Sequence, residues 1–378
     1  NTENDEKCAA DTGIIDYNEK NYPNFLKLLN LLNINKNNSD MSFSMSVNEG
    51  KLEYSGSLRG LFGNYKNLLN KEYLLMIKDI LRFYNYALSY KKKNDPKETL
   101  DDFLKRLGFS EYFCNYHLIP MASSIWSSTE SEILKFPINS MLDFYKNHEL
   151  LNFIKRPQWK TISGGSRKYV EALMKILKQK NENKFYLNKE IVEIKKKGNK
   201  KVLIDQKGRK FDFDIIVLAN HTNEASKIIK NYDKKVYSIL KKFRYQKNVA
   251  FLHTDINLMP INKTIWSSWN YLTNTSNEKS SLTYWMNKLQ NLETKEEIFV
   301  TLNPINIPKN EEIIKVINYH HPIYNHHALQ SQKEIEKLQG LNNIFYAGAW
   351  NGYGFHEDGV NSALKICDLL NLKSNLEN

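Results

Sequence analysis

The chain has 378 residues, of which 41% are hydrophobic and 12% aromatic, so its composition is that of a globular protein and excludes a disordered one. The formal net charge is +12, yet no RNA-binding, zinc-finger or helix-turn-helix signature accompanies it, which argues against a nucleic-acid partner. The simplest interpretation of the charge is a solvated, lysine-rich surface. Attraction to an anionic membrane surface is the alternative.

The three cysteines, Cys8, Cys114 and Cys367, are too irregularly spaced for a disulfide framework or a metal site, so we expect no metal. This cysteine usage favours a reducing, cytoplasmic location. No apolar run is long enough to span a membrane. A peripheral position at the inner membrane face remains the alternative to a purely cytoplasmic one.

Apolar spacing predicts helices over residues 24–33, 64–90 and 97–107. The second helix carries an apolar stripe flanked by Lys and Arg, formed by Tyr73, Leu74, Ile77, Ile80, Leu81 and Tyr84. Such a stripe predicts a helix that faces the core. A basic amphipathic helix that touches lipid is the other interpretation.

Strands follow in quick succession between residues 184 and 219. Their ranges are 185–187, 191–194, 201–205 and 213–219, with hairpin turns at Gly198-Asn199 and Lys207-Gly208. The last range is a continuous apolar run, typical of a central parallel strand. Residues 248–303 are again strand-like and rich in aromatic side chains.

Near the C-terminus, a short strand over 343–346 runs into a glycine-rich turn and then a helix. The apolar positions of this helix are Val360, Ala363, Leu364, Cys367 and Leu370, and their spacing predicts one buried face. A strand, glycines and a helix N-terminus in this order can approach an anionic or electron-rich cofactor closely.

The order of these segments predicts an α/β fold with a discontinuous, Rossmann-like cofactor domain, because the parallel strands come from distant parts of the chain. We expect the cofactor domain to comprise residues 1–20, 155–235 and 335–378. The substrate domain, a mixed sheet with helices, is then expected to comprise residues 21–154 and 236–334.

Several short motifs are spread over essentially the whole chain. They comprise residues 11–19, 22–25, 40–44, 119–121 with 125–128, 159–166, 252–255, 259–260, 266–271, 284–287, 300–304 and 348–362. Taken together, these motifs resemble a family of bacterial FAD/NAD-binding proteins in the flavin-containing amine oxidase and phytoene desaturase superfamily. The resemblance implies the amine-oxidase type of FAD-binding fold.

The chain departs from the family at its start. The family opens with a strand, a G-x-G-x-x-G turn and a helix, which are absent here, and Asn1-Thr2 resembles the segment that follows that unit. We expect that the sequence is a fragment lacking this first βαβ unit. Genuine loss of the unit is the alternative.

The resemblance implies FAD as cofactor and indicates where it binds. Ile191 fits the V-x-x-I strand that contacts adenine in the superfamily, and Ala219 ends a central strand where ligands bind in open α/β sheets. The other expected FAD-binding residues are Asp11, Thr12, Gly13, Gly164, Gly165, Ser166, Gly348, Ala349, Trp350, Gly354, Glu357, Asp358, Gly359 and Val360.

The last helix also predicts chemistry. Backbone amides at Gly359, Val360 and Asn361 are expected to stabilise negative charge on a reduced flavin. His356 is the candidate catalytic base, although a histidine in such a turn can serve only to fix the structure.

The expected substrate side is apolar, and its candidate residues are Trp126, Trp266, Trp269, Tyr284, Trp285 and Tyr353. Such aromatic clusters form core as readily as pocket. The family resembled is associated with cyclopropane-fatty-acid synthases, which implies an FAD-dependent desaturase or dehydrogenase acting on a lipid, such as a modified fatty acyl chain. A flavin amine oxidase and a cofactor-less scaffold are the alternatives.

Overall fold

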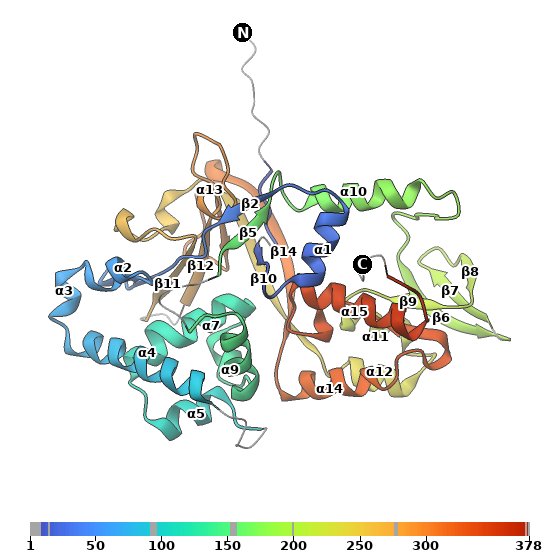
Figure 1. Cartoon of the computed structure of the whole chain (residues 1–378), viewed down its shortest axis with the longest axis horizontal. Coiled ribbons are helices and arrows are strands. Elements are labelled where there is room, and N and C mark those ends of the chain that lie inside the picture. Colours follow the sequence, from blue (N-terminus) through green and yellow to red (C-terminus); the bar gives the residue numbers. More distant parts are fainter. Residues whose placement is uncertain are drawn as a thin grey trace, which may run out of the picture. The chain divides into compact units, whose positions relative to one another are not determined.

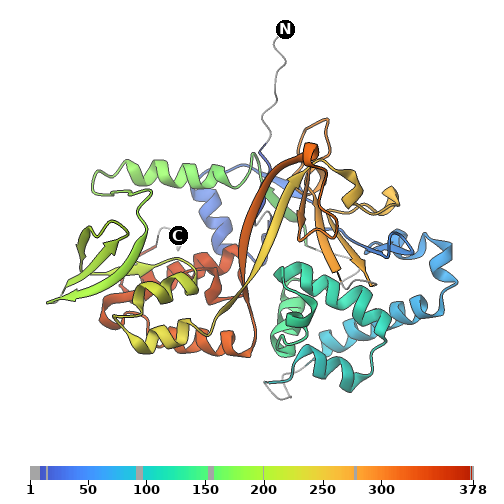
Figure 2. The same cartoon turned by 180° about the vertical axis from the view of Figure 1, so that it is seen from behind.

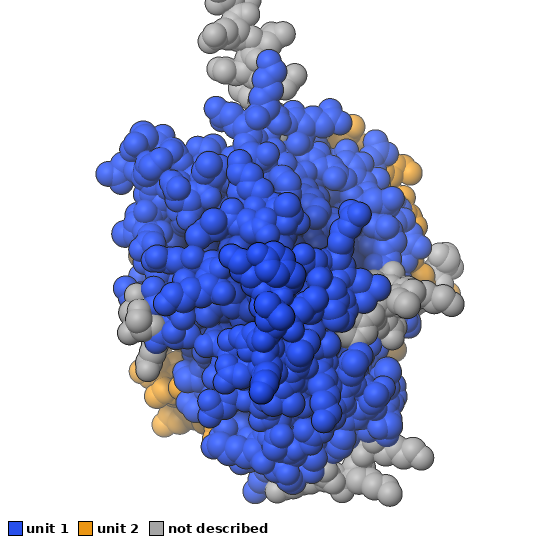
Figure 3. Space-filling view, turned by 90° about the vertical axis from the view of Figure 1, so that its left-hand side faces the viewer, with its two compact units in different colours: residues 1–21, 35–168, 246–321 blue, residues 22–34, 169–245, 322–378 orange. Residues whose placement is uncertain are grey.

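The computed structural model describes residues 9–13, 16–90, 97–151, 157–198, 200–275, 279–374 and 376. The chain divides into two compact units, coloured separately in Figure 3. Unit 1 comprises residues 1–21, 35–168 and 246–321, and unit 2 comprises residues 22–34, 169–245 and 322–378. The three segments of the expected FAD-binding domain are shared between these units, so the domain division, which was defined by function, stays a prediction.

Unit 1 is built on two sheets. Within its described residues, one sheet has the order β1-β5-β2 and the other the order β14-β10-β13-β12-β11-β3-β4. The strands are β1 (Asp16–Asn18), β2 (Lys36–Ser39), β3 (Phe43–Val47), β4 (Leu52–Ser55), β5 (Trp159–Ile162), β10 (Arg244–His253), β11 (Trp269–Asn274), β12 (Lys279–Trp285), β13 (Phe299–Leu302) and β14 (Ile313–Ile323). The strand-rich character predicted for residues 248–303 is confirmed.

The helices of unit 1, apart from the short α13, gather in one group beside the larger sheet, as both views show (Figures 1 and 2). They are α2 (Leu58–Phe62), α3 (Tyr65–Leu68), α4 (Lys71–Ser89), α5 (Leu100–Leu107), α6 (Glu111–Phe113), the π-helical turn η1 (Cys114–Leu118), α7 (Ile119–Trp126), α8 (Glu130–Ile133) and α9 (Ile138–Asn147), with α13 (Met286–Leu289) after β12. Short 3-10 turns occur at η2 (Ile256–Leu258), η3 (Lys263–Ile265) and η4 (Asn310–Glu312).

The single helix predicted over residues 64–90 is wrong, because Asn70 starts a new helix. The Asn70 side chain accepts hydrogen bonds from the amides of Glu72 and Tyr73 and so caps α4, while Asn64 caps the short α3. Asparagine side chains satisfy the free amides of a first helical turn, which favours starting a helix over continuing one.

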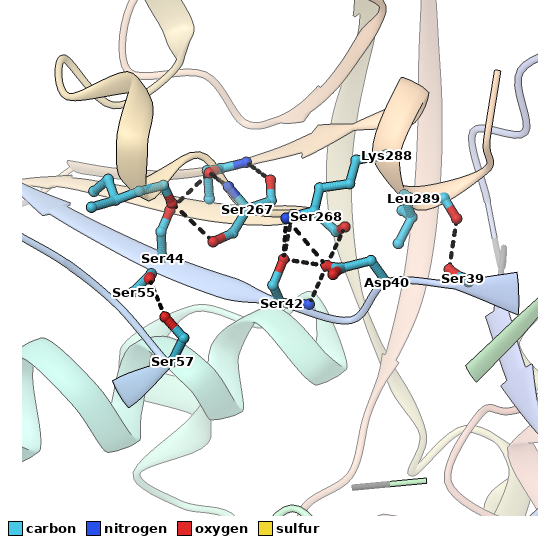
Figure 4. A network of polar contacts seen from close by, with 12 residues as sticks. Ser39, Asp40, Ser42, Ser44, Ser55, Ser57, Ser267, Ser268, Lys288 and Leu289 are labelled. Atoms are coloured by element: carbon cyan, nitrogen blue, oxygen red, sulfur yellow. Dashed lines mark hydrogen bonds and ion pairs between the residues drawn. The ribbon is translucent and has the colours of Figure 1, made fainter. Parts of the chain in front are cut away.

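A polar network joins the N-terminal ends of the parallel strands β3 and β11 (Figure 4). The Asp40 carboxylate accepts hydrogen bonds from the amide and hydroxyl of Ser42 and from the hydroxyl of Ser268, at 2.9 Å. Lys288 Nζ lies 3.6 Å from the same carboxylate. These bonds outweigh the cost of burial and lower the pKa of Asp40. The network therefore fixes the register of strands that are distant in the sequence.

Unit 2 contains a parallel strand pair, β9 (Ile216–Leu218) with β15 (Ile344–Tyr346), and a sheet ordered β6-β7-β8. The latter strands are β6 (Ile191–Lys197), β7 (Lys200–Asp205) and β8 (Lys210–Phe213). The helices are α1 (Pro23–Leu31), α10 (Arg167–Lys178), which begins in unit 1, α11 (Thr222–Ile229), α12 (Lys234–Leu240), α14 (His326–Glu336) and α15 (His356–Leu369), with 3-10 turns η5 (Leu341–Asn343) and η6 (Ala349–Asn351). Helices α11, α12 and α14 pack around β9 and β15 in one hydrophobic core.

The predicted pairing of distant segments in a parallel sheet is confirmed, since Ile216 pairs with Ile344 and Leu218 with Tyr346. Two details were wrong. The apolar run at 213–219 is divided between β8 and a short β9, and Val217 remains 45% exposed. Residues 185–187 form no strand, and Leu187 is 81% exposed, because apolar residues without a paired neighbour gain little from an extended conformation.

Both predicted hairpins of unit 2 are present. Gly198 and Gly208 adopt φ values of 59° and 74° at the β6–β7 and β7–β8 turns, whereas Asn199 lies outside the described residues. No helix in the described part of the chain is both long and apolar enough to cross a membrane.

Candidate functional site

The predicted strand, turn and helix near the C-terminus are present as β15, η6 and α15. Two glycines in the turn have backbones that other residues tolerate poorly. Gly348 has a φ of 140°, and a Cβ there would lie 2.7 Å from the Trp350 indole nitrogen. Gly354 has a φ of 94°, and its Cβ would lie 2.8 Å from the Tyr324 hydroxyl oxygen. The turn therefore requires glycine at both positions.

Asp358 organises the same turn from within the helix. Its carboxylate accepts hydrogen bonds from the amides of Tyr353 and Phe355, at 2.9 and 3.0 Å. Burial raises the pKa of Asp358, although these hydrogen bonds oppose the shift. Asp358 is thus engaged in holding the turn against α15.

Glu357 has a different role, at the start of another helix. Its buried carboxylate accepts hydrogen bonds from the amides of Asn24 and Phe25, at 3.0 and 2.8 Å, in the first turn of α1. A carboxylate is favourable there because the amides of a first turn lack partners inside the helix. Glu357 therefore fixes α1 to α15.

Helix α15 begins earlier than predicted, at His356, and the Gly359 amide donates to the Phe355 carbonyl at 3.2 Å. The first-turn amides of the helix are thus those of His356, Glu357 and Asp358, three residues before the predicted set. The predicted buried face is also wrong. Ala363 is exposed, and the buried residues of α15 are Glu357, Ser362 and Ile366.

His356 contacts two aromatic rings. Its ring lies 4.6 Å from the Phe25 ring, and its Nε2 is 3.1 Å from the Tyr169 hydroxyl. Burial lowers the pKa of His356 to about 4, so the imidazole is neutral at pH 7. These contacts give His356 a packing role between α1, α10 and α15. The assignment of a catalytic base stays a prediction.

The carboxyl ends of β9 and β15 meet at one edge, as parallel strands require. The Ala347 amide donates to the Leu218 carbonyl, and the Trp350 indole donates to the Asn220 carbonyl at 3.2 Å. Ala219 is exposed at this edge, whereas the Trp350 side chain is buried against Phe243. The structure thus brings Ala219 together with residues 348–350, but it places the Trp350 ring in the core.

Polar atoms without partners lie around this edge. Asn220 Oδ1, Asn223 Oδ1 and the Tyr324 hydroxyl are buried and have no hydrogen-bond partner among the described residues. Asn220 follows β9, Asn223 lies in the first turn of α11, and Tyr324 touches Gly354. Buried polar atoms are normally paired, so these three fit an edge that receives a polar ligand such as FAD.

Ile191 is the first residue of β6, in the same unit. It pairs with Asp205 of β7 and is followed by an irregularity in the register before Glu193. Ile194, the other residue of the V-x-x-I-like pattern, is buried in the core of unit 2. Ile191 thus lies on the strand that the adenine prediction requires, and the contact itself stays a prediction.

Unit 1 brings together a second group of predicted FAD-binding residues. Asp11 Oδ2 accepts hydrogen bonds from the amide and hydroxyl of Ser166, at 2.7 and 2.9 Å. A Cβ at Gly165, whose φ is 87°, would lie 3.2 Å from Asp11 Oδ1. Gln290, which the sequence did not single out, accepts from the Asp11 amide at 2.9 Å. The Asp11 carboxylate therefore occupies the backbone amide of Ser166, the residue before α10.

The neighbours of this group are less constrained. Thr12 shares a hydrogen bond of 2.6 Å with the Tyr319 hydroxyl. Gly164 has a φ of 77° beside the Lys168 side chain, and Gly13 is exposed with no atom near an added Cβ. The predicted close approach is thus visible at Gly165 and absent at Gly13.

The predicted substrate residues divide into separate places. Trp126 is buried in the helical core, 4.5 Å from the Phe136 ring. Trp269 and Tyr284 lie opposite each other on β11 and β12, with ring centres 5.0 Å apart. Trp285 is the next residue of β12 and so points to the other face, where its ring meets Trp266 at 5.5 Å.

The indole nitrogens of Trp269 and Trp285 indicate which of these rings is suited to line a substrate site. Trp269 Nε1 is buried without a hydrogen-bond partner among the described residues, whereas Trp285 Nε1 donates to Glu297. Tyr353, the sixth candidate, lies in unit 2 with its ring 6.1 Å from Tyr324. The pair of Trp269 and Tyr284 therefore remains the candidate lining of unit 1.

Sequence reasoning missed a buried carboxyl group beside this pair. Asp16 Oδ1 lies 2.6 Å from Ser39 Oγ, which lies 2.6 Å from the Leu289 carbonyl. Burial raises the pKa of Asp16 well above its ordinary value. A single hydroxyl proton serves one acceptor, so a protonated Asp16 that donates to Ser39 satisfies both bonds. An acidic residue inside the apolar stretch Ile14–Tyr17 was the available signal.

Comparisons with known proteins agree with this architecture. The profile of the family described as flavin containing amine oxidoreductase matches residues 1–291. No curated protein sequence matches the chain.

Solved structures of this fold are similar in shape and distant in sequence. A putative protoporphyrinogen oxidase from Exiguobacterium sp. 255-15 has a TM-score of 0.65 at 13% identity, over 95% of this chain and 87% of that one. A fatty acid isomerase from P. acnes that produces CLA has a TM-score of 0.62 at 13% identity, over 97% and 88%. Putrescine oxidase bound to putrescine has a TM-score of 0.61 at 11% identity, over 94% and 87%.

The profile match covers more than half of the chain, and the strand edge in unit 2 has buried polar atoms without a hydrogen-bond partner among the described residues, which suits a ligand. The chain therefore belongs to the flavin-containing amine oxidoreductase family and is an FAD-dependent oxidoreductase.

Proposed function

We propose that this protein removes hydride from an apolar carbon chain, such as a modified fatty acyl group, as a desaturase or dehydrogenase. The observation that carries the proposal is the neutral character of the aromatic pair in unit 1. Burial raises the pKa of Tyr284, so its hydroxyl stays protonated, and burial likewise raises the pKa of the Asp16 carboxyl well above its ordinary value, which favours its neutral form.

A neutral, aromatic lining suits a hydrocarbon substrate better than an ammonium group. A cationic amine is best recognised by an ionised carboxylate, because burying the ammonium group without a partner of opposite charge is costly. The nearby carboxyl group of Asp16 bonds to Ser39 and is not available as such a partner. The edge-on packing of Trp269 and Tyr284 supplies a large apolar surface instead.

FAD supplies the two-electron acceptor when bound. The residues proposed to hold it in unit 2 are those at the carboxyl edge of β9 and β15, with Asn220 and Tyr324 offering polar atoms. Asp358 fixes the turn, and Glu357 fixes the helix behind it. In unit 1, Asp11 and Ser166 hold the predicted close-approach turn in place.

Amine oxidation is the second candidate function, and the same aromatic pair favours it. Two facing rings in an apolar site can bind a neutral amine between them, and putrescine oxidase shares the fold. A flavin-dependent fatty acid isomerisation, as in the P. acnes neighbour, is the closest variant of the first candidate.

Anaerobic reduction of bound flavin distinguishes these candidates. The purified protein, made both as this chain and with any upstream reading frame restored, is first scanned for flavin absorbance. It is then mixed without oxygen with fatty acyl substrates or with primary amines. We expect bleaching by acyl chains. Bleaching by amines alone would move amine oxidation to first place.

Variants test the lining directly. We expect Trp269→Leu and Tyr284→Leu, each of which removes one ring of the pair, to slow acyl-dependent bleaching about two- to tenfold, since an aromatic contact contributes roughly 0.5–1.5 kcal/mol beyond its buried area. Tyr186→Leu, at an exposed ring of unit 2, is the control. Flavin bands in neither form of a folded protein would favour the scaffold alternative.

A further inference from the structure

Helices α2 and α3 of unit 1 present large apolar side chains to solvent. Leu58 and Phe62 of α2 are 59% and 47% exposed, and Tyr65, at the start of α3, and Leu69, its C-cap, are 69% and 80% exposed. Each pair is separated by four residues, so its two side chains lie on the same face of the helix. Four such residues within twelve positions form an apolar surface rather than isolated exposed groups.

The backbone beneath these side chains is held to the core. The Tyr73 hydroxyl donates to the Leu61 carbonyl at 2.9 Å, and the Asn67 side chain donates to the Glu53 carbonyl at 2.8 Å. Leu61 and Asn67 themselves are buried. Because the inward residues fix both helices, the outward direction of the apolar side chains is set by the fold.

Helix α4 continues this character. Its buried side carries Tyr73, Met76, Ile80 and Phe83, among others. On its solvent side, Leu74, Leu81 and Leu88 are 46%, 50% and 47% exposed, and their spacing of seven residues places them in one stripe. The stripe predicted from the sequence therefore divides into a core-facing part and an exposed part.

The charges among these residues are nearly all positive. The exposed basic residues include Arg59, Lys66, Lys71 and Lys78. The stretch from 57 to 90 has two acidic residues, of which Glu72 is exposed and Asp79 is buried. Cations interspersed with leucine and aromatic side chains match the interface of an anionic bilayer. There the apolar groups enter the acyl boundary and the cations meet the headgroups.

We propose that the exposed apolar and basic residues of α2, α3 and α4, called here the α2–α4 surface, bind an anionic lipid bilayer by shallow insertion. The surface consists of Leu58, Arg59, Phe62, Tyr65, Lys66, Leu69, Lys71, Leu74, Lys78, Leu81 and Leu88. Charge complementarity commits the surface to lipid rather than to a protein partner. The proposal does not depend on the substrate proposed above, because binding to vesicles requires neither flavin nor turnover.

Vesicle flotation with the whole chain tests this proposal. We expect the protein to float with vesicles of phosphatidylcholine mixed with phosphatidylglycerol, to float less with phosphatidylcholine alone, and to be released by salt. Phe62→Ser combined with Leu69→Ser should weaken binding about tenfold or more, because neither serine side chain can bury apolar surface in the acyl boundary. Both side chains are exposed, so circular dichroism should remain unchanged.

Matched controls separate the surface from general hydrophobicity and charge. Leu187→Ser removes a leucine that is 81% exposed in unit 2, against 80% for Leu69, and should leave flotation unchanged. Lys66→Glu with Lys71→Glu should abolish the preference for anionic vesicles. Lys234→Glu with Lys235→Glu, on exposed positions of α12, should reduce it far less.

Three outcomes would overturn the proposal. The first is absence of flotation with anionic vesicles. The second is equal loss of binding in the surface variants and their controls. The third is a dimer in solution that Phe62→Ser with Leu69→Ser converts to a monomer, which would assign this surface to contact between two copies of the chain.

Discussion

Acid should destabilise this protein through His356. Its pKa is about 4 in the fold, against an ordinary value of 6.5, so the unfolded chain binds the proton more tightly. The contribution of His356 to the free energy of unfolding is therefore fully present above about pH 6.5 and is lost as the pH is lowered toward 4. The difference of about 2.5 pKa units corresponds to about 3 kcal/mol, as an upper bound.

Replacing His356 by Phe should remove this part of the pH dependence while keeping the ring contacts with Phe25 and Tyr169. The assay is urea unfolding followed by circular dichroism at pH 7 and pH 4.5. His148 and His253 also have pKa values lowered to about 4 by burial, so the difference between variant and wild type isolates His356. His327→Phe, at an exposed position of α14, is the control.

The reasoning is refuted if His356→Phe and the wild type lose the same free energy of unfolding between the two pH values. The same variant separates packing from catalysis. A packing role predicts that flavin reduction by substrate persists in His356→Phe at pH 7. A loss of reduction by several orders of magnitude, with flavin still bound, would show that His356 is the base after all.

Three further outcomes are expected. Gly354→Ala should lower flavin occupancy and lower the free energy of unfolding by about 2–4 kcal/mol, because it adds a close contact with Tyr324 to a strained φ. The control Gly208→Ala, at a φ of 74° with open space around it, should lower it by only about 1 kcal/mol, and equal losses in urea unfolding would contradict this reasoning. Asp16→Asn should raise the free energy of unfolding by about 1–3 kcal/mol at pH 7 and by much less near pH 4, because a carboxyl whose pKa is raised in the fold destabilises the folded state as the pH rises. The Asn side chain can still donate to Ser39, and a gain that does not change with pH would exclude a protonated Asp16. Glu357→Ala should lower the free energy of unfolding by about 1–3 kcal/mol, because it leaves two first-turn amides of α1 without their carboxylate, whereas the control Glu72→Ala on α4 should lower it by less than about 0.5 kcal/mol. Hydrogen exchange at the amides of Asn24 and Phe25 reports the change, and unaltered protection there would refute it.

Local patterns were reliable where a few neighbouring residues decide the conformation. The hairpins of unit 2 follow from Gly198 and Gly208, and α1 follows from the apolar spacing after Pro23. The limits of helices were less reliable, because side chains such as Asn70 decide where a helix begins. The strand predicted at 185–187 was wrong because its apolar side chains found no partner strand.

The candidate site shows the same division. The glycine-rich turn was visible in the sequence, since Gly348 and Gly354 occupy conformations or spaces that exclude other residues. The different roles of Glu357 and Asp358 were not visible in the sequence. The Glu357 carboxylate binds amides of α1, more than three hundred residues earlier in the chain, while the Asp358 carboxylate binds amides of the turn just before it. Contacts of this kind depend on which elements meet.

By itself, the sequence determined the class of fold, the parallel pairing of segments around 216 and 344, and the family, because these depend on periodicity and on the identity of short motifs. The tertiary structure decided which side chains keep their charge and which face solvent. Burial raises the pKa of Asp16 and lowers that of His356 because neighbouring elements exclude water from them, and Leu74 and Leu81 of the predicted α4 stripe are exposed because the core covers only one side of the helix. Desolvation and coverage are properties of packing between distant segments, which residue order alone does not specify.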